Sequence, residues 1–308
     1  MADFLPPRPR YARERALYSF LMLFCFGAML AVRLLAKFLP DLFSSPLLIL
    51  GLQLIVFLIP SLVFMRLRGR GYARAIRLRR PFATHLPLLL AAFFTLLTGA
   101  LLLSILFGGT ETVGNSAGSF EKSAPLTLLQ GLVAVPAVAL LPALCEELLF
   151  RGILCTELDR RGAWRALLVG SLLFALIHFD LANLPVYFFA GMLLMLIVYA
   201  TDSLIAAMLV HALYNLVSLF AQRYLNALYS FTGNVELFLF LVILAFLVSL
   251  LFFCFFASKE YRSRAARDLP SPRRDVPRDV QLYTTLDALC EVPILLCLVI
   301  SVVGFIIL

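Results

Sequence analysis

Three short motifs place ionisable and amide side chains inside strongly apolar stretches of the sequence. An ionisable group inside a membrane span costs about 2.5–3.5 kcal/mol even on the mildest insertion scale, so such a residue is a functional candidate by default. A carboxylate, two imidazoles and an amide are the groups that drive the attack of water on a peptide bond. In chain order these residues are Glu146, Glu147, Arg151, His178, His211 and Asn215.

The first motif reads Glu146-Glu147-x-x-x-Arg151. Adjacent residues point about 100° apart on a helix, so the two carboxylates cannot share a face. Glu147 precedes Arg151 by four residues, the favourable orientation for an ion pair, which leaves Glu146 unpaired and free to act on water. Pro136 and Pro142 precede the carboxylates. They weaken the helix and free backbone groups for polar partners.

The other two motifs each pair a histidine with a residue one helical turn away. Phe174 lies four residues before His178 and can wall its imidazole, and His211 shares a helix face with Asn215. Each motif alone also has a structural interpretation: a salt bridge at the membrane edge, or hydrogen bonds between helices. The three motifs lie on three consecutive helices that carry polar residues. This combination favours a catalytic site over a purely structural role.

The composition indicates a polytopic membrane protein. Of the 308 residues, 62% are hydrophobic and only 14% are charged, and the mean hydropathy is +0.98. These values exclude an ordinary soluble enzyme and a disordered chain. The net charge is +8. In a chain this apolar, Lys and Arg orient membrane spans rather than bind nucleic acid.

About nine apolar stretches (eight to nine) predict an all-α fold of transmembrane helices, because a span needs about 20 apolar residues. The fifth, sixth and seventh stretches are short. The predicted spans are Ala16–Leu39, Pro46–Met65, Leu86–Phe107, Leu126–Leu149, Ala166–Phe179, Pro185–Ala200, Leu204–Ala221, Leu237–Ala257 and Val292–Leu308.

The distribution of positive charge predicts a cytoplasmic N-terminus. With nine spans and that orientation, 22 of the 26 Lys and Arg fall in segments on the inside, as the positive-inside rule requires. These segments include a basic loop at 66–80 and an Arg/Pro-rich linker at 258–280. We expect N-terminal membrane helices over 1–125, a catalytic core over 126–221 and C-terminal helices over 222–308, in a bacterial plasma membrane.

The ordered motifs resemble those of the CPBP family, the CAAX protease and bacteriocin-processing family, also called Abi or type II CAAX prenyl endopeptidase-like. The resemblance covers about Leu126–Leu219. It implies an α-helical membrane fold that encloses a polar cavity open to the cytosol, and an integral-membrane endopeptidase. Under this resemblance Glu146 is the general base and His178 orients and activates the water. His211 and Asn215 stabilise the oxyanion.

The resemblance also assigns supporting roles. Glu147 and Arg151 would support the helix and the site, and Phe174 would form part of the wall of the site. The use of a metal stays open: Glu146, His178 and His211 could ligate zinc. The sequence has no H-E-x-x-H motif, however, and the metal-free mechanism is favoured. No other cofactor is expected.

The expected partners are the membrane and a peptide or protein substrate with a cytosolic or membrane-embedded cleavage site, and not nucleic acid. Two alternatives to the protease stay open. One is a non-catalytic bacteriocin-immunity or scaffold protein of the same fold. The other, less favoured, is a transporter, which predicts internal repeats and broken helices in matching halves that the sequence does not display.

Overall fold

The structure is a computed structural model that describes residues 8–69, 71–108, 135–160, 162–266 and 278–308. All regular secondary structure in these residues is helical, which confirms the predicted all-α fold class. The α-helices are α1 (Arg8–Phe38), α2 (Pro46–Gln53), α3 (Ile59–Arg68), α4 (Tyr72–Ala75), α5 (Leu86–Gly108), α8 (Leu141–Glu147), α9 (Cys155–Asp159), α10 (Ala163–Leu176), α11 (Leu184–Thr201), α12 (Leu204–Thr232), α13 (Val235–Ala266), α14 (Arg278–Leu289) and α15 (Val292–Ile307).

Several of these helices can cross a membrane. Among the described residues, five are long and apolar enough: Leu17–Phe38, Leu47–Arg68, Ala83–Phe107, Leu184–Thr201 and Val235–Arg264. A sixth candidate is the pair of α14 and α15, bent by 66° at its break, and two shorter apolar helices cover Ala163–Leu176 and Leu204–Leu219. The chain is therefore an integral multi-pass membrane protein. The count of nine stays a prediction, since residues 109–134, with the start of the fourth span, lie outside the described residues.

Several helix boundaries differ from the predicted spans: α1 begins at Arg8 rather than Ala16, and α12 ends at Thr232 rather than Ala221. Helix α10, which corresponds to the fifth predicted span, ends at Leu176, so the last three residues of that span lie beyond it. Helix α13, which corresponds to the eighth predicted span, continues past the predicted end at Ala257 to Ala266, because the sequence from Lys259 to Ala266 is rich in strong helix formers. The linker predicted at 258–280 is correspondingly shorter, and its residues 267–277 lie outside the described part.

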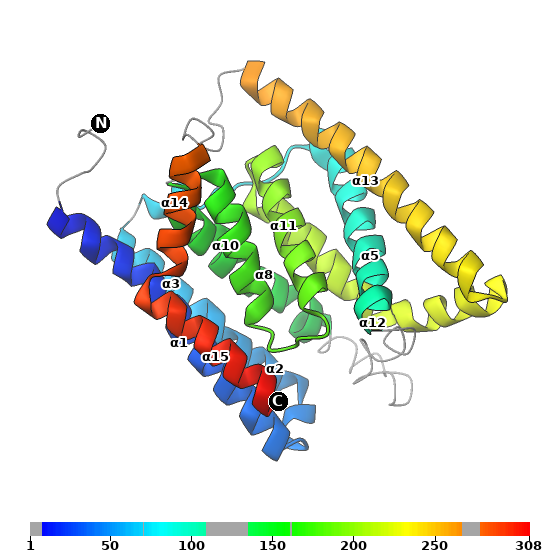
Figure 1. Cartoon of the computed structure of the whole chain (residues 1–308), viewed down its shortest axis with the longest axis horizontal. Coiled ribbons are helices and arrows are strands. Elements are labelled where there is room, and N and C mark those ends of the chain that lie inside the picture. Colours follow the sequence, from blue (N-terminus) through cyan, green and yellow to red (C-terminus); the bar gives the residue numbers. More distant parts are fainter. Residues whose placement is uncertain (1–7, 70, 109–134, 161, 267–277) are drawn as a thin grey trace.

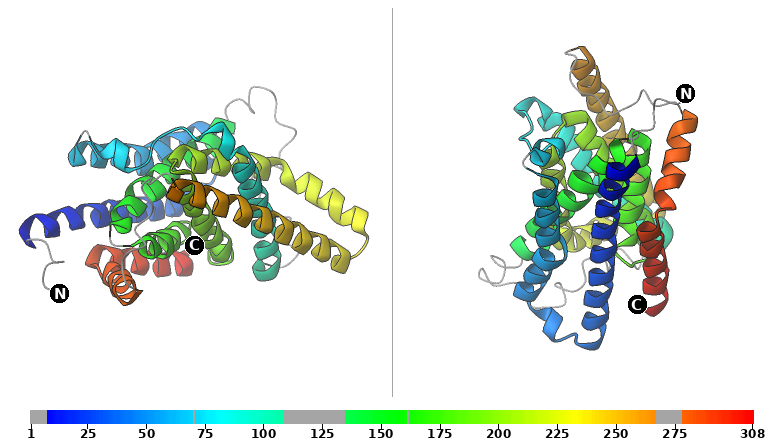
Figure 2. Two further views of the ribbon diagram at one scale, coloured as in Figure 1. Left: turned by 90° about the horizontal axis from the view of Figure 1, so that it is seen from above. Right: turned by 90° about the vertical axis from the view of Figure 1, so that its left-hand side faces the viewer.

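The motif-bearing helices occupy the centre of the molecule. Helices α8, α10 and α11 lie between α1 and α15 on one side and α5 and α13 on the other (Figure 1). Helix α15 lies along α1 in both further views (Figure 2). The central helices are largely buried, whereas large apolar side chains of α13 such as Leu251 and Phe252 are exposed, as expected for a helix that faces lipid.

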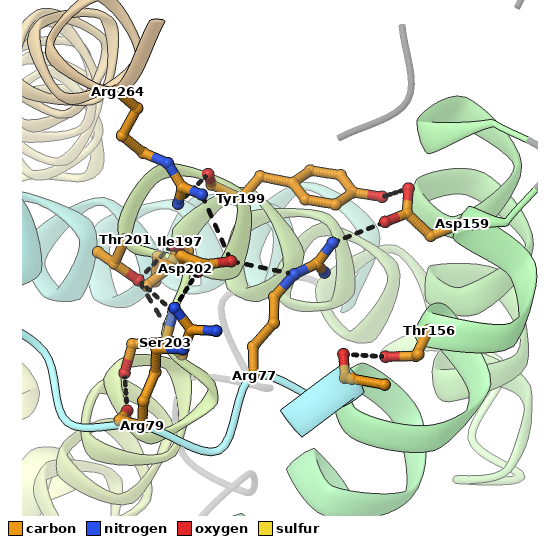
Figure 3. Close-up of polar contacts among 11 residues, drawn as sticks. Arg77, Arg79, Thr156, Asp159, Ile197, Tyr199, Thr201, Asp202, Ser203 and Arg264 are labelled. Carbon is orange, nitrogen blue, oxygen red and sulfur yellow. Dashed lines mark hydrogen bonds and ion pairs between the residues drawn. The ribbon is translucent and has the colours of Figure 1, made fainter. Parts of the chain in front are cut away.

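A polar network gathers one end of several helices around Asp202 (Figure 3). Asp202 ends α11 in the left-handed conformation, with φ of 54°. Its carboxylate lies 3.2 Å from Arg77 Nε, 2.8 Å from Arg79 Nη1 and 3.4 Å from Arg264 Nη2. Arg77 also pairs with Asp159 at the end of α9, over 2.7 Å.

This network joins four segments that the nine-span topology places on one side of the membrane. They are the basic loop at 66–80, the end of α9, the turn between α11 and α12, and the end of α13. Their contacts show that these segments meet, which agrees with the predicted alternation of spans. The assignment of that side to the cytoplasm stays a prediction.

We predict that Asp202→Asn destabilises the protein. The amide keeps the shape but cannot pair with three guanidinium groups, and hydrogen bonds to charged groups contribute about 2 kcal/mol. The melting temperature in detergent, followed by circular dichroism, should fall. Glu236→Gln, on an exposed carboxylate in the first turn of α13, is the control and should leave it unchanged. An unchanged melting temperature for Asp202→Asn would show that the network does not stabilise the fold.

Candidate functional site

The helix that carries the two carboxylates is interrupted on both sides by wide turns. π-Helical turns at Pro136–Leu140 and Leu148–Leu154 flank α8. The first begins at one of the two prolines expected to weaken this helix, since proline lacks an N–H and cannot make the normal bond to the preceding turn. Such turns occur frequently at functional sites. Here they set the direction of the side chains on α8.

Glu147 is a fully buried carboxylate with two charged or polar partners. Its Oε1 accepts a bond from Arg151 Nη1 over 2.6 Å and lies 2.8 Å from His211 Nδ1. The predicted pair of Glu147 with Arg151 is therefore present, with side chains 0% and 2% exposed. The contact with His211 was not predicted. It joins α8 to α12 through a bond between side chains 64 residues apart.

The ring of Phe174 is a common neighbour of three polar side chains of the site, Arg151, His178 and His211. The Arg151 guanidinium carbon lies 4.0 Å from the ring centroid, a cation–π contact. The ring centroids of His178 and His211 lie 5.0 Å and 6.1 Å from it, both edge to face. Phe174 therefore walls His178, as the spacing predicts, and packs against His211 and Arg151 as well.

His178 lies just beyond the end of α10, and the tight last turn fixes its imidazole. The backbone N–H of His178 bonds to Ala175 at 3.3 Å rather than to Phe174 four residues back. The Phe174 carbonyl is thereby left for His178 Nδ1, which lies 2.7 Å away. Because a carbonyl only accepts, Nδ1 carries the proton and Nε2 keeps its lone pair. The Tyr187 ring stacks on the imidazole at 3.9 Å.

Glu146 and Asn215 are the two site residues with the fewest partners. Glu146 is half-buried, and within the described part of the chain its carboxylate forms no hydrogen bond or ion pair. It interacts electrostatically with His211, Glu147 and Arg151. Asn215 Nδ2 donates to the Ala139 carbonyl over 3.5 Å, which leaves its second N–H free for another acceptor.

Two further residues belong to this neighbourhood and were missed in the sequence. Tyr187 covers one face of His178. Arg33 of α1 interacts electrostatically with Glu146 and His178. Arg33 carried a signal, since an arginine within an apolar run is a functional candidate. Tyr187 carried none, because its distance along the chain from His178 does not indicate that their rings stack.

The residues named as potential zinc ligands do not fit a metal site in this arrangement. Among the residues that the structure describes, no three His, Cys, Asp or Glu side chains are grouped so that they could hold a metal ion. Glu146, His178 and His211 are therefore not gathered as three ligands in this arrangement; the metal-free mechanism stays a prediction, and no step below is routed through a metal.

Comparison with known proteins agrees with the resemblance predicted from the motifs. The family model described as Rce1-like, type II CAAX prenyl endopeptidase Rce1-like, matches residues 128–217. This confirms the recognition of the CAAX protease family in the central part of the chain, which contains all the motif residues. No curated protein and no solved structure matches.

We predict that Arg151→Met strongly destabilises the protein. Removing one partner of a buried pair leaves an uncompensated charge, which costs about 3–5 kcal/mol. Thermal melting in detergent should show a clear decrease in the melting temperature. The double variant Glu147→Gln/Arg151→Met removes both charges and should be less destabilised than the sum of the single variants. Additive effects would contradict a coupled pair.

Proposed function

We propose that this protein is an integral-membrane endopeptidase that hydrolyses a peptide bond with a water molecule activated by Glu146 and His178. The observation that carries the proposal is the unpaired carboxylate of Glu146 beside a buried set of partners, Glu147, Arg151 and His211. The match to type II CAAX prenyl endopeptidases over residues 128–217 supports the same class of reaction.

The first step is removal of a proton from water. Glu146 has no competing partner among the described residues and takes the proton as general base. His178 keeps a lone pair on Nε2, because its Nδ1 donates to the Phe174 carbonyl. It can accept the second hydrogen of the water and so orient the attacking oxygen. Tyr187 and Phe174 hold the imidazole in place.

The second requirement is stabilisation of the oxyanion that forms when water attacks the carbonyl. His211 donates Nδ1–H to Glu147, so it presents a second N–H at Nε2 only when the ring is doubly protonated. The bond to Glu147 fixes the direction in which Nε2 points. The free N–H of Asn215 is the second donor. Donors placed in advance in a water-poor site are the strongest means of lowering such a barrier.

The reaction closes when Glu146 returns its proton to the leaving amine and the carbon–nitrogen bond breaks. The products are a new carboxylate and a new amine, and the enzyme is regenerated. Glu147, Arg151 and Phe174 do not exchange protons in this scheme. They keep His211 and His178 in position, which is the supporting role expected for them.

We propose a peptide or protein substrate whose cleavage site lies at or within the membrane. The site residues lie on helices packed in the centre of a membrane protein, so the scissile bond must reach them from the bilayer or its surface. A prenylated C-terminal peptide is one candidate, because the matched family is that of type II CAAX prenyl endopeptidases. Unprenylated membrane peptides are the other.

We predict that Glu146→Gln and His178→Gln lower kcat about 10²–10⁴-fold, the usual effect of losing a general base or the group that orients its water. The amide introduced by Glu146→Gln keeps the shape of the carboxylate but cannot take a proton. Purified protein in detergent would be incubated with a library of prenylated and unprenylated membrane peptides, and the products identified by mass spectrometry. Wild-type protein should cleave with and without a zinc chelator.

The matched control is His85→Gln, a histidine at the start of α5 that contacts Glu260 and has no role in the site. It should cleave like wild type. Activity retained in Glu146→Gln would contradict the assigned base, and loss of activity on chelation would contradict the metal-free mechanism. No cleavage by folded wild-type protein would favour the alternative of a non-catalytic immunity or scaffold protein.

A further inference from the structure

The residue after His178 has an unusual backbone conformation. Phe179 has φ of 51°, in the left-handed region that glycine adopts readily and that a side chain disfavours. Such a conformation persists only when the surrounding structure imposes it, and these residues cluster at functional sites. A left-handed residue commonly ends a helix, with its N–H bonded three residues back as Phe179 is to Leu176. Glycine or asparagine usually takes that position, so a phenylalanine there must be held by its packing.

The Phe179 side chain is enclosed by two helices that lie outside the motif region. It is buried, with 6% exposure. Its ring meets Phe26 of α1 edge to face at 6.3 Å. On the other side it lies directly on the backbone of Gly304 in α15, where an added Cβ would be 2.9 Å from Phe179 Cε1 and 3.1 Å from Cγ. We call this enclosure, formed by Phe26 and Gly304, the Phe179 socket.

Phe179 and His178 share the tight last turn of α10. The backbone N–H groups of His178 and Phe179 bond to Ala175 and Leu176, three residues back, so the last turn of α10 is tight. This tight turn is what leaves the Phe174 carbonyl for His178 Nδ1. If this turn relaxed to the ordinary helical pattern, the His178 N–H would return to the Phe174 carbonyl and displace the imidazole.

We propose that Phe179, held by the Phe179 socket, is a positioning residue that sets the orientation and the proton position of His178. Helices α1 and α15 thereby act on the site through one buried ring. The catalytic consequence rests on the role proposed for His178, whereas the structural consequence does not. The proposal gives α15, which lies beyond the matched region of 128–217, a defined part in activity.

The test is Gly304→Ala, which adds one methyl group against the Phe179 ring. Gly51→Ala is the matched control, because nothing lies within 4 Å of a Cβ added at that membrane-helix glycine. The chain has three histidines, so ¹⁵N-histidine labelling gives few ring signals, and His178→Gln assigns that of His178. We expect Gly304→Ala to shift the His178 signals and leave those of His85 in place.

On a peptide that wild-type protein cleaves, we expect Gly304→Ala to lower kcat at least tenfold with little change in KM, since substrate contacts are unaltered. Gly51→Ala should match wild type in both readouts. Adding Phe179→Leu to Gly304→Ala shortens the opposing side chain and should restore part of kcat. Should Gly304→Ala not fold, Phe26→Leu opens the other wall of the socket and should shift the same signals.

Unchanged His178 signals in Gly304→Ala and in Phe26→Leu would overturn the proposal, whatever the activity. An equal decrease in kcat for Gly51→Ala would also overturn it, because the effect would then be a general one of the substitution. If wild-type protein cleaves no peptide but the His178 signals shift as expected, the positioning by Phe179 stands. In that case it is the proposed endopeptidase activity that fails.

Discussion

A charged carboxylate with no exposed surface dominates the architecture of this protein. Taking Glu147 out of contact with water and lipid costs several kcal/mol unless partners neutralise it, and its Oε1 atom finds two: Arg151 from its own helix and His211 from α12. The pair holds α8 and α12 together, and Phe174 of α10 packs against both partners. The three helices that bear the motifs are thus joined by one carboxylate and one ring. The residues that contact water or substrate in the proposed reaction, Glu146 and His178, lie around this fixed centre.

Much of the fold was predictable, because membrane spans follow from length and hydropathy alone. The candidate membrane spans in α1, α5 and α11 lie within a few residues of the predicted spans. Of the boundaries that differed, the end of α13 follows from local helix formers, whereas tertiary contacts decide the end of α10. Helix α10 stops at Leu176 because Phe179 packs against α1 and α15. No local signal in the sequence predicts that packing. The ion pairs of Asp202 were likewise not predicted, because its three arginine partners come from segments far from it along the chain.

The site was predictable where its contacts are local in sequence. The pairs of Glu147 with Arg151 and of Phe174 with His178 follow from a spacing of four residues, and both are present. The link from His211 to Glu147 joins different helices, and neither residue's own surroundings in the sequence specify it. The stacking of Tyr187 on His178 was missed for the same reason. The proton on Nδ1 of His178 depends on a backbone carbonyl made available by the end of a helix, which only the three-dimensional arrangement reveals.

The wide turns that flank α8 make the number of residues in this segment a functional quantity in itself. Each wide turn accommodates one residue more than an ordinary α-helix would, and the surplus is absorbed without a break in the chain. Deleting a single residue between Leu148 and Leu154 would allow an ordinary helix to form. Because the wide turn absorbs its surplus residue, the helix on either side would keep nearly the same phase; losing a second residue there would rotate everything before it, both carboxylates included, by about 100° relative to α9. No side chain would need to change for the site to be lost. Evolutionary change in this helix is therefore constrained in length as well as in composition, and related chains should conserve its phase even where its apolar residues vary.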